Sequence, residues 1–154
     1  MLKDNKNMIA LSLVAIFFIS LDRLLKVLAF TNQDRQFNIL GEVLKFSYKN
    51  NYYIAFSLPL SGAWLNAAIF LIILLLFFYL LKAIMSGKRG IALCLFAVAL
   101  GAAGNLFDRL KYGYVIDYLD LKYFMVFNLD DIMIMVGIIT FIWPNLFRDQ
   151  SNSF

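Results

Sequence analysis

The chain has 154 residues, of which 62% are hydrophobic and 16% are charged, and its formal net charge is +4. Soluble domains are closer to half apolar and a quarter charged, so this composition excludes an ordinary soluble domain and indicates a membrane protein. The basic residues are spread along the chain and form no face or stripe of the kind that binds nucleic acid.

The content of cysteine and histidine restricts the chemistry further. There is one cysteine, Cys94, and there is no histidine. An intrachain disulfide is therefore excluded, as are the usual zinc sites and any serine or cysteine nucleophile with a histidine base. Acid–base chemistry must fall to Asp, Glu, Lys or Tyr side chains, and we expect no cofactor and no metal.

Four apolar stretches are long enough to cross a bilayer, which takes about 20 helical residues. They lie near residues 8–30, 63–85, 91–108 and 129–147. The first follows two lysines, as a signal peptide would, but its apolar run is too long and no small-residue cleavage site follows it. We expect a retained span, and the prediction is a single integral membrane domain, residues 1–154, of the membrane all-α class with four transmembrane helices.

The basic residues also set the expected orientation. They are denser in the segments that would face the cytoplasm, including the short turn from Ser86 to Gly90, than in the longer outer segments. By the positive-inside rule, both termini are expected in the cytoplasm.

The segment between the first two spans predicts a small extracytoplasmic antiparallel β-sheet. Residues 44–48 and part of 51–57 alternate apolar and polar side chains, and Lys49-Asn50 could form the turn between them. We place this outer β region at residues 37–58, on the outer surface of the membrane.

Polar side chains from separate spans gather at one depth, near the outer face. Ionisable residues inside a span cost several kcal/mol, so each one is a candidate for function. The residues are Asp22 and Lys26 in the first span, Asn105, Asp108 and Arg109 at the end of the third, Asp117 in a short outer excursion at 111–127, and Asn128, Asp130 and Asp131 at the mouth of the fourth. The cytoplasmic halves carry almost none, which predicts one functional site at the outer face.

Three blocks of sequence carry most of these residues. They are Gly101-Ala102-Ala103-Gly104-Asn105-Leu106-Phe107-Asp108-Arg109, then Gly113-Tyr114-Val115-Ile116-Asp117, then Phe127-Asn128-Leu129-Asp130-Asp131. The blocks resemble the GxxGNxxDR, GxVxD and FNxAD patterns of bacterial lipoprotein signal peptidase (signal peptidase II), an aspartic peptidase family. Asp22 and Lys26 resemble its DQxxK motif, and residues 51–56 resemble a degraded NxGAAF motif.

The resemblance implies an aspartic endopeptidase of a bacterial cytoplasmic (inner) membrane, with Asp117 and Asp131 as the catalytic pair. Its substrate would be a prolipoprotein cut just before a diacylglyceryl-modified cysteine, and the peptide antibiotic globomycin would inhibit it. Two close carboxylates cannot easily both ionise, so they share a proton. The charged member can then take a proton from water while the protonated member polarises the scissile carbonyl. The expected partners are this substrate and membrane lipids, with no nucleic acid, and we expect a monomer.

Other residues of the blocks could support the catalytic pair. Asn105 and Asn128 are uncharged donors and acceptors that could orient the two acids or the substrate backbone. Arg109 could hold Asp108 or a substrate carbonyl. Asn51 belongs to the sheet that we expect to cover a lipid-bearing substrate.

A structural role competes with a functional one at four positions. Gly101 and Gly104 are three residues apart and could admit either a neighbouring helix or a substrate helix. Asp22 and Lys26 are four residues apart, and we interpret them as a structural ion pair rather than a catalytic one.

The chain departs from the family pattern at three positions. Arg23 stands where the family usually has Gln, Tyr53 where it has Gly, and Asp130 where it has Ala. We interpret Arg23 as a side chain that extends to the headgroups, and Asp130 as a helix N-terminal acid stabilised by the helix dipole. These departures indicate a divergent member.

Two other functions remain open from the sequence. A small four-helix transporter would use membrane carboxylates as proton or cation sites, and it would need an acid near mid-membrane with access from both sides. A non-catalytic homologue would bind lipopeptides without cutting them.

Overall fold

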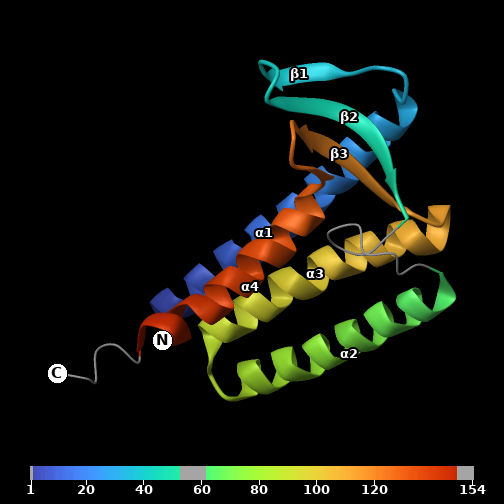
Figure 1. Ribbon diagram of the computed structural model, residues 1–154. Coiled ribbons are helices and arrows are strands. Elements are labelled where there is room, and N and C mark those ends of the chain that lie inside the picture. Colours follow the sequence, from blue (N-terminus) through green and yellow to red (C-terminus); the bar gives the residue numbers. More distant parts are fainter. Residues whose placement is uncertain (1, 53–61, 149–154) are drawn as a thin grey trace.

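The computed structural model describes residues 2–52 and 62–148, and those residues form four helices and one antiparallel sheet (Figure 1). The helices are α1 (Leu2–Thr31), α2 (Ala63–Met85), α3 (Arg89–Tyr112) and α4 (Leu129–Arg148). The strands are β1 (Phe37–Leu40), β2 (Leu44–Asn51), β3 (Val115–Leu121) and β4 (Met125–Phe127). Helices therefore occupy all four ranges predicted as spans, and α3 continues beyond its predicted end by one turn.

Helix α3 is the centre of the helical layer and packs against the other three helices. Glycines allow α4 to approach it closely. A Cβ at Gly101 would lie 2.5 Å from the carbonyl oxygen of Asp130, and a Cβ at Gly137 would lie 2.6 Å from the side chain of Val98. The close approach brings the start of α4 against the polar end of α3.

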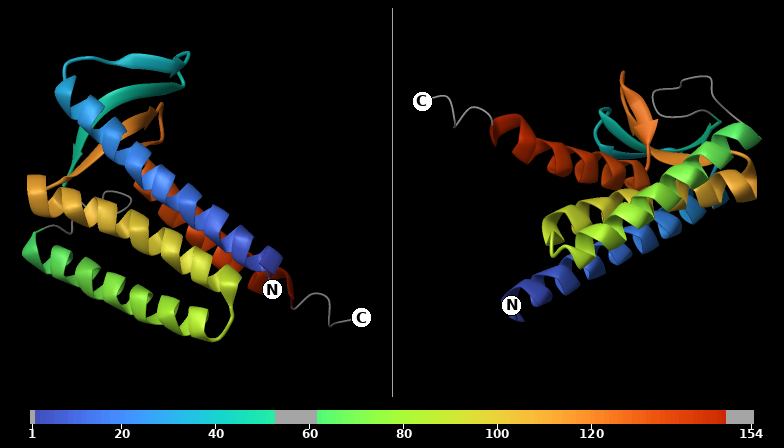
Figure 2. Two further views of the ribbon diagram at one scale, coloured as in Figure 1. Left: turned by 180° about the vertical axis from the view of Figure 1, so that it is seen from behind. Right: turned by 90° about the horizontal axis from the view of Figure 1, so that it is seen from below.

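The sheet lies at one end of the helices, as the views in Figures 1 and 2 agree. The start of α1, the turn between α2 and α3, and the end of α4 all lie at the opposite end. The two ends of the molecule therefore differ, and the sheet marks the end at which the polar residues gather.

The strand order is β1-β2-β3-β4, and all neighbours are antiparallel. The predicted turn at Lys49-Asn50 is wrong, because both residues lie within β2 and pair with Asp117 and Ile116 of β3. The turn lies instead between β1 and β2, where Gly41 has a φ of 50°, a left-handed conformation that favours glycine. The predicted outer excursion supplies β3 and β4. The part of the predicted outer β region beyond residue 52 is outside the described residues.

Strand β3 fastens the sheet to the helices. Ile116 and Tyr118 are buried against Ala29 of α1 in one core cluster. Val115 and Asp117 alternate with them along the strand and are buried as well, since β3 contacts both α1 and α3. This burial on both faces places a carboxylate inside the molecule, at the junction of sheet and helices.

Within the described residues, α2 and α3 are long and apolar enough to cross a membrane by length and composition. Helix α2 exposes many of its large apolar side chains, among them Phe70, Leu74 and Phe78. Soluble monomers rarely expose apolar surface on this scale, so the exposed apolar side chains are consistent with a membrane protein. The four-span topology remains a prediction.

Candidate active site

Helix α4 begins with a reciprocal pair of hydrogen bonds between Asn128 and Asp131. The Asp131 N–H donates to Oδ1 of Asn128 over 2.9 Å, and the Asn128 N–H donates to Oδ2 of Asp131 over 3.3 Å. This is a capping box, in which N–H groups at the start of a helix find side-chain acceptors. It fixes the Asp131 carboxylate at the helix N-terminus, where the partial positive charge stabilises an anion.

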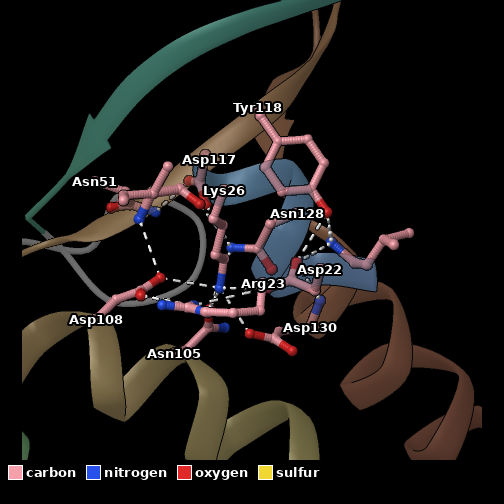
Figure 3. A network of polar contacts seen from close by, with 12 residues as sticks. Asp22, Arg23, Lys26, Asn51, Asn105, Asp108, Asp117, Tyr118, Asn128 and Asp130 are labelled. Carbon is pink, nitrogen blue, oxygen red and sulfur yellow. Dashed lines mark hydrogen bonds and ion pairs between the residues drawn. The ribbon is translucent and has the colours of Figure 1, made fainter. Parts of the chain in front are cut away.

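The side-chain amide of Asn128 also holds Asp117, the other acid of the predicted pair (Figure 3). Asn128 Nδ2 donates to Asp117 Oδ1 over 2.6 Å, and Asn51 Nδ2, at the end of β2, donates to Asp117 Oδ2 over 2.9 Å. On the second acid, Nδ2 of Asn105 in α3 donates to Asp131 Oδ1 over 2.8 Å. Three asparagines from separate elements therefore bracket the two carboxylates.

Asp117 is buried, and its side chain is set up to hold a proton. Burial raises the pKa of Asp117 to about 7, and the negative charge of Asp131 adds to this rise. The hydrogen bonds from Asn51 and Asn128 oppose it. An aspartate ordinarily has a pKa of about 3.9, so Asp117 differs from a surface carboxyl in being able to stay protonated close to neutral pH.

A cluster of charges centred on Lys26 lies beside the carboxylate pair (Figure 3). The buried ammonium lies 2.6 Å from Asp130, 2.8 Å from Asp22 and 3.0 Å from Asp108. The guanidinium of Arg23 supplies a second cation, 2.7 Å from Oδ1 of Asp108. Buried charges are tolerated when they are paired, because desolvation of an isolated ion costs several kcal/mol.

Asp22 anchors the start of α4 to α1. Its Oδ1 accepts hydrogen bonds from the Leu129 N–H over 3.0 Å, the Asp130 N–H over 3.4 Å and the Tyr118 hydroxyl over 2.8 Å. An anion at the first N–H groups of a helix is favoured by both the hydrogen bonds and the dipole. Asp22 thereby helps to fix the turn that carries Asp131.

Asn105 joins the charge cluster to the carboxylate pair. Its Oδ1 accepts hydrogen bonds from Lys26 Nζ and from Asn128 Nδ2, each over 3.2 Å. Its Nδ2 is the group that donates to Asp131. A displacement of the Lys26 ammonium would therefore act on Asp131 through a single intervening side chain.

Gly101 and Gly104 both face the start of α4. A Cβ at Gly104 would overlap the carboxylate of Asp130, and a Cβ at Gly101 would meet the carbonyl oxygen of the same residue. The structure thus places both glycines against α4, and the space at Gly104 is the space that the Asp130 side chain fills.

Arg109 adds a further positive charge at the site. Its half-buried guanidinium lies within electrostatic range of Asp131, Asp117 and Asp108. Among residues 2–52 and 62–148, no group of three or more acidic or cysteine side chains is arranged to hold a metal ion, and the Lys26 ammonium occupies the centre of the three carboxylates around it. The site offers one buried acid, Asp117, and one half-buried acid, Asp131, which are linked through Asn128 and surrounded by amide and guanidinium groups.

The sequence profile of the family described as Signal peptidase (SPase) II matches residues 14–147. The chain belongs to this family. The resemblance inferred from the sequence blocks is confirmed, and membership of the signal peptidase II family makes the chain a peptidase.

Individual signal peptidase II relatives are similar in sequence to this chain over most of its length. The lipoprotein signal peptidase of Streptococcus agalactiae is 31% identical over 151 residues, which cover 94% of this chain and 96% of the relative. The lipoprotein signal peptidase of Moorella thermoacetica is 29% identical over 136 residues, with coverage of 87% and 91%. That of Caldicellulosiruptor bescii is 39% identical over 107 residues, which are 69% of each chain.

Two solved structures of bacterial membrane enzymes share the fold. One has a TM-score of 0.76 and 24% sequence identity, and the match covers 94% of this chain and 92% of that one. The other has a TM-score of 0.72 and 23% identity, with coverage of 89% and 92%. The predicted helical fold with a small antiparallel sheet is therefore confirmed.

Two interpretations of the departures from the signal peptidase II pattern are incomplete. Arg23 has partners within the protein, since its guanidinium is paired with Asp108 and lies 5.0 Å from the centre of the Phe107 ring. Asp130 is more than an acid at a helix N-terminus, because its buried side chain is ion-paired with Lys26 of α1. The sequence predicted neither ion pair, because spacing along one helix does not reveal its contacts with another.

Tyr118 belongs to the site and was missed in the sequence. Its side chain is fully buried, and its hydroxyl donates to Asp22. The sequence signal for Tyr118 was its position directly after Asp117, the last residue of the GxVxD block. A tyrosine buried there would need a partner for its hydroxyl.

Proposed function

We propose that this signal peptidase II family member is an aspartic endopeptidase that removes the signal peptide from prolipoproteins, cutting just before a diacylglyceryl-modified cysteine. The observation that supports this most is that one residue, Asn128, bonds both Asp117 and Asp131. A pair of acids, one able to keep its proton and one charged, can hydrolyse a peptide bond without a histidine, and this chain has none.

The two acids take different roles in the proposed reaction. Asp131, at the N-terminus of α4, is the charged member and takes a proton from a water molecule. Asp117 carries the shared proton and donates a hydrogen bond to the scissile carbonyl oxygen, which becomes negative as the water oxygen attacks the carbonyl carbon. Arg109, which is within electrostatic range of both acids, would stabilise this developing charge. Asp131 then passes the proton that it took from water to the peptide nitrogen, the C–N bond breaks, and the signal peptide leaves with the new carboxyl group.

The catalytic pair would sit near the outer face of a bacterial cytoplasmic (inner) membrane. In this proposal, residues 1–154 form a single integral membrane domain with four spans and both termini in the cytoplasm. The separation of features along the helices supports it, because the sheet lies at one end and the α2–α3 turn lies at the other. That turn carries Lys88 and Arg89 at its end, in accord with the positive-inside rule.

The test is cleavage of a diacylglyceryl-modified prolipoprotein by the purified protein in detergent, followed by the shift in size on a gel. We expect conversion of the lipidated substrate to the mature form. Globomycin should inhibit this cleavage by acting at the same site. We also expect the enzyme to be a monomer. The matched control is the same prolipoprotein with the acceptor cysteine replaced by serine, which cannot be lipidated and should stay uncut. A protein that binds the lipidated substrate and never cuts it would be a lipopeptide-binding homologue, and the proposal would be wrong.

A further inference from the structure

The charge cluster around Lys26 contains more acids than bases. Asp22, Asp108 and Asp130 form ion pairs with the two cations Lys26 and Arg23, so these five groups together have a net charge of minus one when all are ionised. Arg23 reaches Asp108 at 2.7 Å and Asp22 at 4.0 Å. In the part of the chain that the structure describes, Asp130 has Lys26 as its ion-pair partner, and its Oδ1 is buried with no hydrogen bond.

Each of the other two acids has support besides Lys26. Asp108 has the guanidinium of Arg23, and Asp22 has the Tyr118 hydroxyl and the first N–H groups of α4. Asp130 therefore depends on Lys26 more than its neighbours do. Lys26 is available to Asp130 only while the charge of Asp108 is neutralised from another side, because two buried carboxylates compete for one ammonium.

We propose that Arg23 and Asp130 are a coupled pair of positioning residues, in which Arg23 neutralises Asp108 so that Lys26 can hold Asp130 and Asn105 together. The two residues do not contact each other and are linked through Asp108 and Lys26. Asn105 carries the effect to the carboxylate pair, because it accepts from Lys26 and donates to Asp131.

Exchanging Arg23 for Gln and Asp130 for Ala, the residues that the motif resemblance gives at these positions, removes one cation and one anion from the cluster. Removing Arg23 alone leaves three carboxylates around one ammonium. Replacing both residues leaves Asp22 and Asp108 with Lys26, which restores the net charge of minus one. The two departures therefore compensate each other in charge, and either one alone would not.

A double-mutant cycle tests the coupling, with Arg23→Gln, Asp130→Ala and the double variant. We expect Arg23→Gln to lower the melting temperature and to lower kcat about tenfold, or about 1.4 kcal/mol, with little change in KM. Asp130→Ala should have a smaller effect, and the double variant should regain most of the loss in both quantities. Arg23→Lys keeps the charge and should retain most of the activity.

A surface ion pair provides the matched control. Glu42 and Lys45 are 2.8 Å apart on the β1–β2 hairpin, and Glu42→Gln, Lys45→Gln and their combination should show little coupling. The kcat readout rests on the proposed function, but the melting-temperature cycle does not, so failure to cleave any substrate leaves the coupling measurable. Additive effects of Arg23→Gln and Asp130→Ala on the melting temperature would overturn the proposal. If Arg23→Gln alone yields no folded protein, recovery of folded protein in the double variant supports it, and failure of that recovery overturns it.

Discussion

The side-chain amide of Asn128 donates a hydrogen bond to Asp117 over 2.6 Å, and Asn128 is the residue directly before α4. The same side chain accepts the Asp131 N–H over 2.9 Å. The direction of the amide is therefore set by the helix, while Asp117 is carried by the sheet. One capping residue thus fixes how a strand carboxylate and a helix carboxylate lie relative to each other.

Replacing Asn128 with Ala should lower both stability and activity. Loss of the cap costs about 1 kcal/mol of unfolding free energy, to be measured by thermal unfolding. Loss of the donor to Asp117 lets the two acids separate, and misplacement of about 1 Å in an active site can cost roughly a hundredfold in kcat. The control is Asn32→Ala, which removes a surface amide bonded to the Leu28 carbonyl and should leave kcat unchanged. Full activity in Asn128→Ala would show that the cap does not position the pair.

The activity should fall as the pH rises through about 7, because the pKa of Asp117 is raised to about 7 by burial and by the nearby charge of Asp131. Below that pH Asp117 carries the proton that polarises the carbonyl, and above it both acids are charged. The measurement is kcat/KM as a function of pH, which reports the ionisation of the free enzyme. A kcat/KM that stays level well above pH 7 would contradict the assignment of the proton to Asp117.

Asp117 should make stability fall as the pH rises, whereas a salt-bridged aspartate makes stability rise with pH. In the unfolded chain Asp117 ionises at its ordinary pKa of about 3.9. In the folded protein it keeps its proton up to about pH 7, so the folded state binds more protons in this window and stability falls as the pH rises across it. Asp117→Asn should lack this contribution when melting temperatures are compared across the window.

Gly104→Ala should destabilise the protein, because the new Cβ would overlap the Asp130 carboxylate that Lys26 holds. Overpacking of this kind costs roughly 1–3 kcal/mol of unfolding free energy. The matched control is Gly90→Ala in the same helix, where a Cβ has open space and alanine favours the helix. Asp130→Ala in the Gly104→Ala background should restore the melting temperature to that of Asp130→Ala alone, since the overlapping group is gone. An unchanged melting temperature in Gly104→Ala would mean that α3 and α4 adjust freely.

The sequence predicts the helices better than the contacts between elements. The apolar run at 129–147 matches α4 (Leu129–Arg148) closely, because helix formation there depends on local composition. The turn placed at Lys49-Asn50 is wrong because those residues pair with β3, and alternation within one segment does not reveal a distant partner. The ion pair of Arg23 with Asp108 joins positions 85 residues apart and has no local signature. The motif resemblance predicted that Asp117 and Asp131 belong to one site. It also predicted that asparagines could orient them, but not which asparagine bonds which acid.

In the proposed mechanism Asp117 and Asp131 together carry out the hydrolysis, and cleavage of the lipidated prolipoprotein by Asp117→Asn and Asp131→Asn tests both roles. Asparagine keeps the size of the side chain and removes its acid–base function, so both variants should bind the substrate while the cleavage rate falls at least about a hundredfold. Asp120→Asn, in the same strand as Asp117 but outside the site, should cut at the wild-type rate. Cleavage at the wild-type rate by either Asp117→Asn or Asp131→Asn would show that the substituted acid is not catalytic.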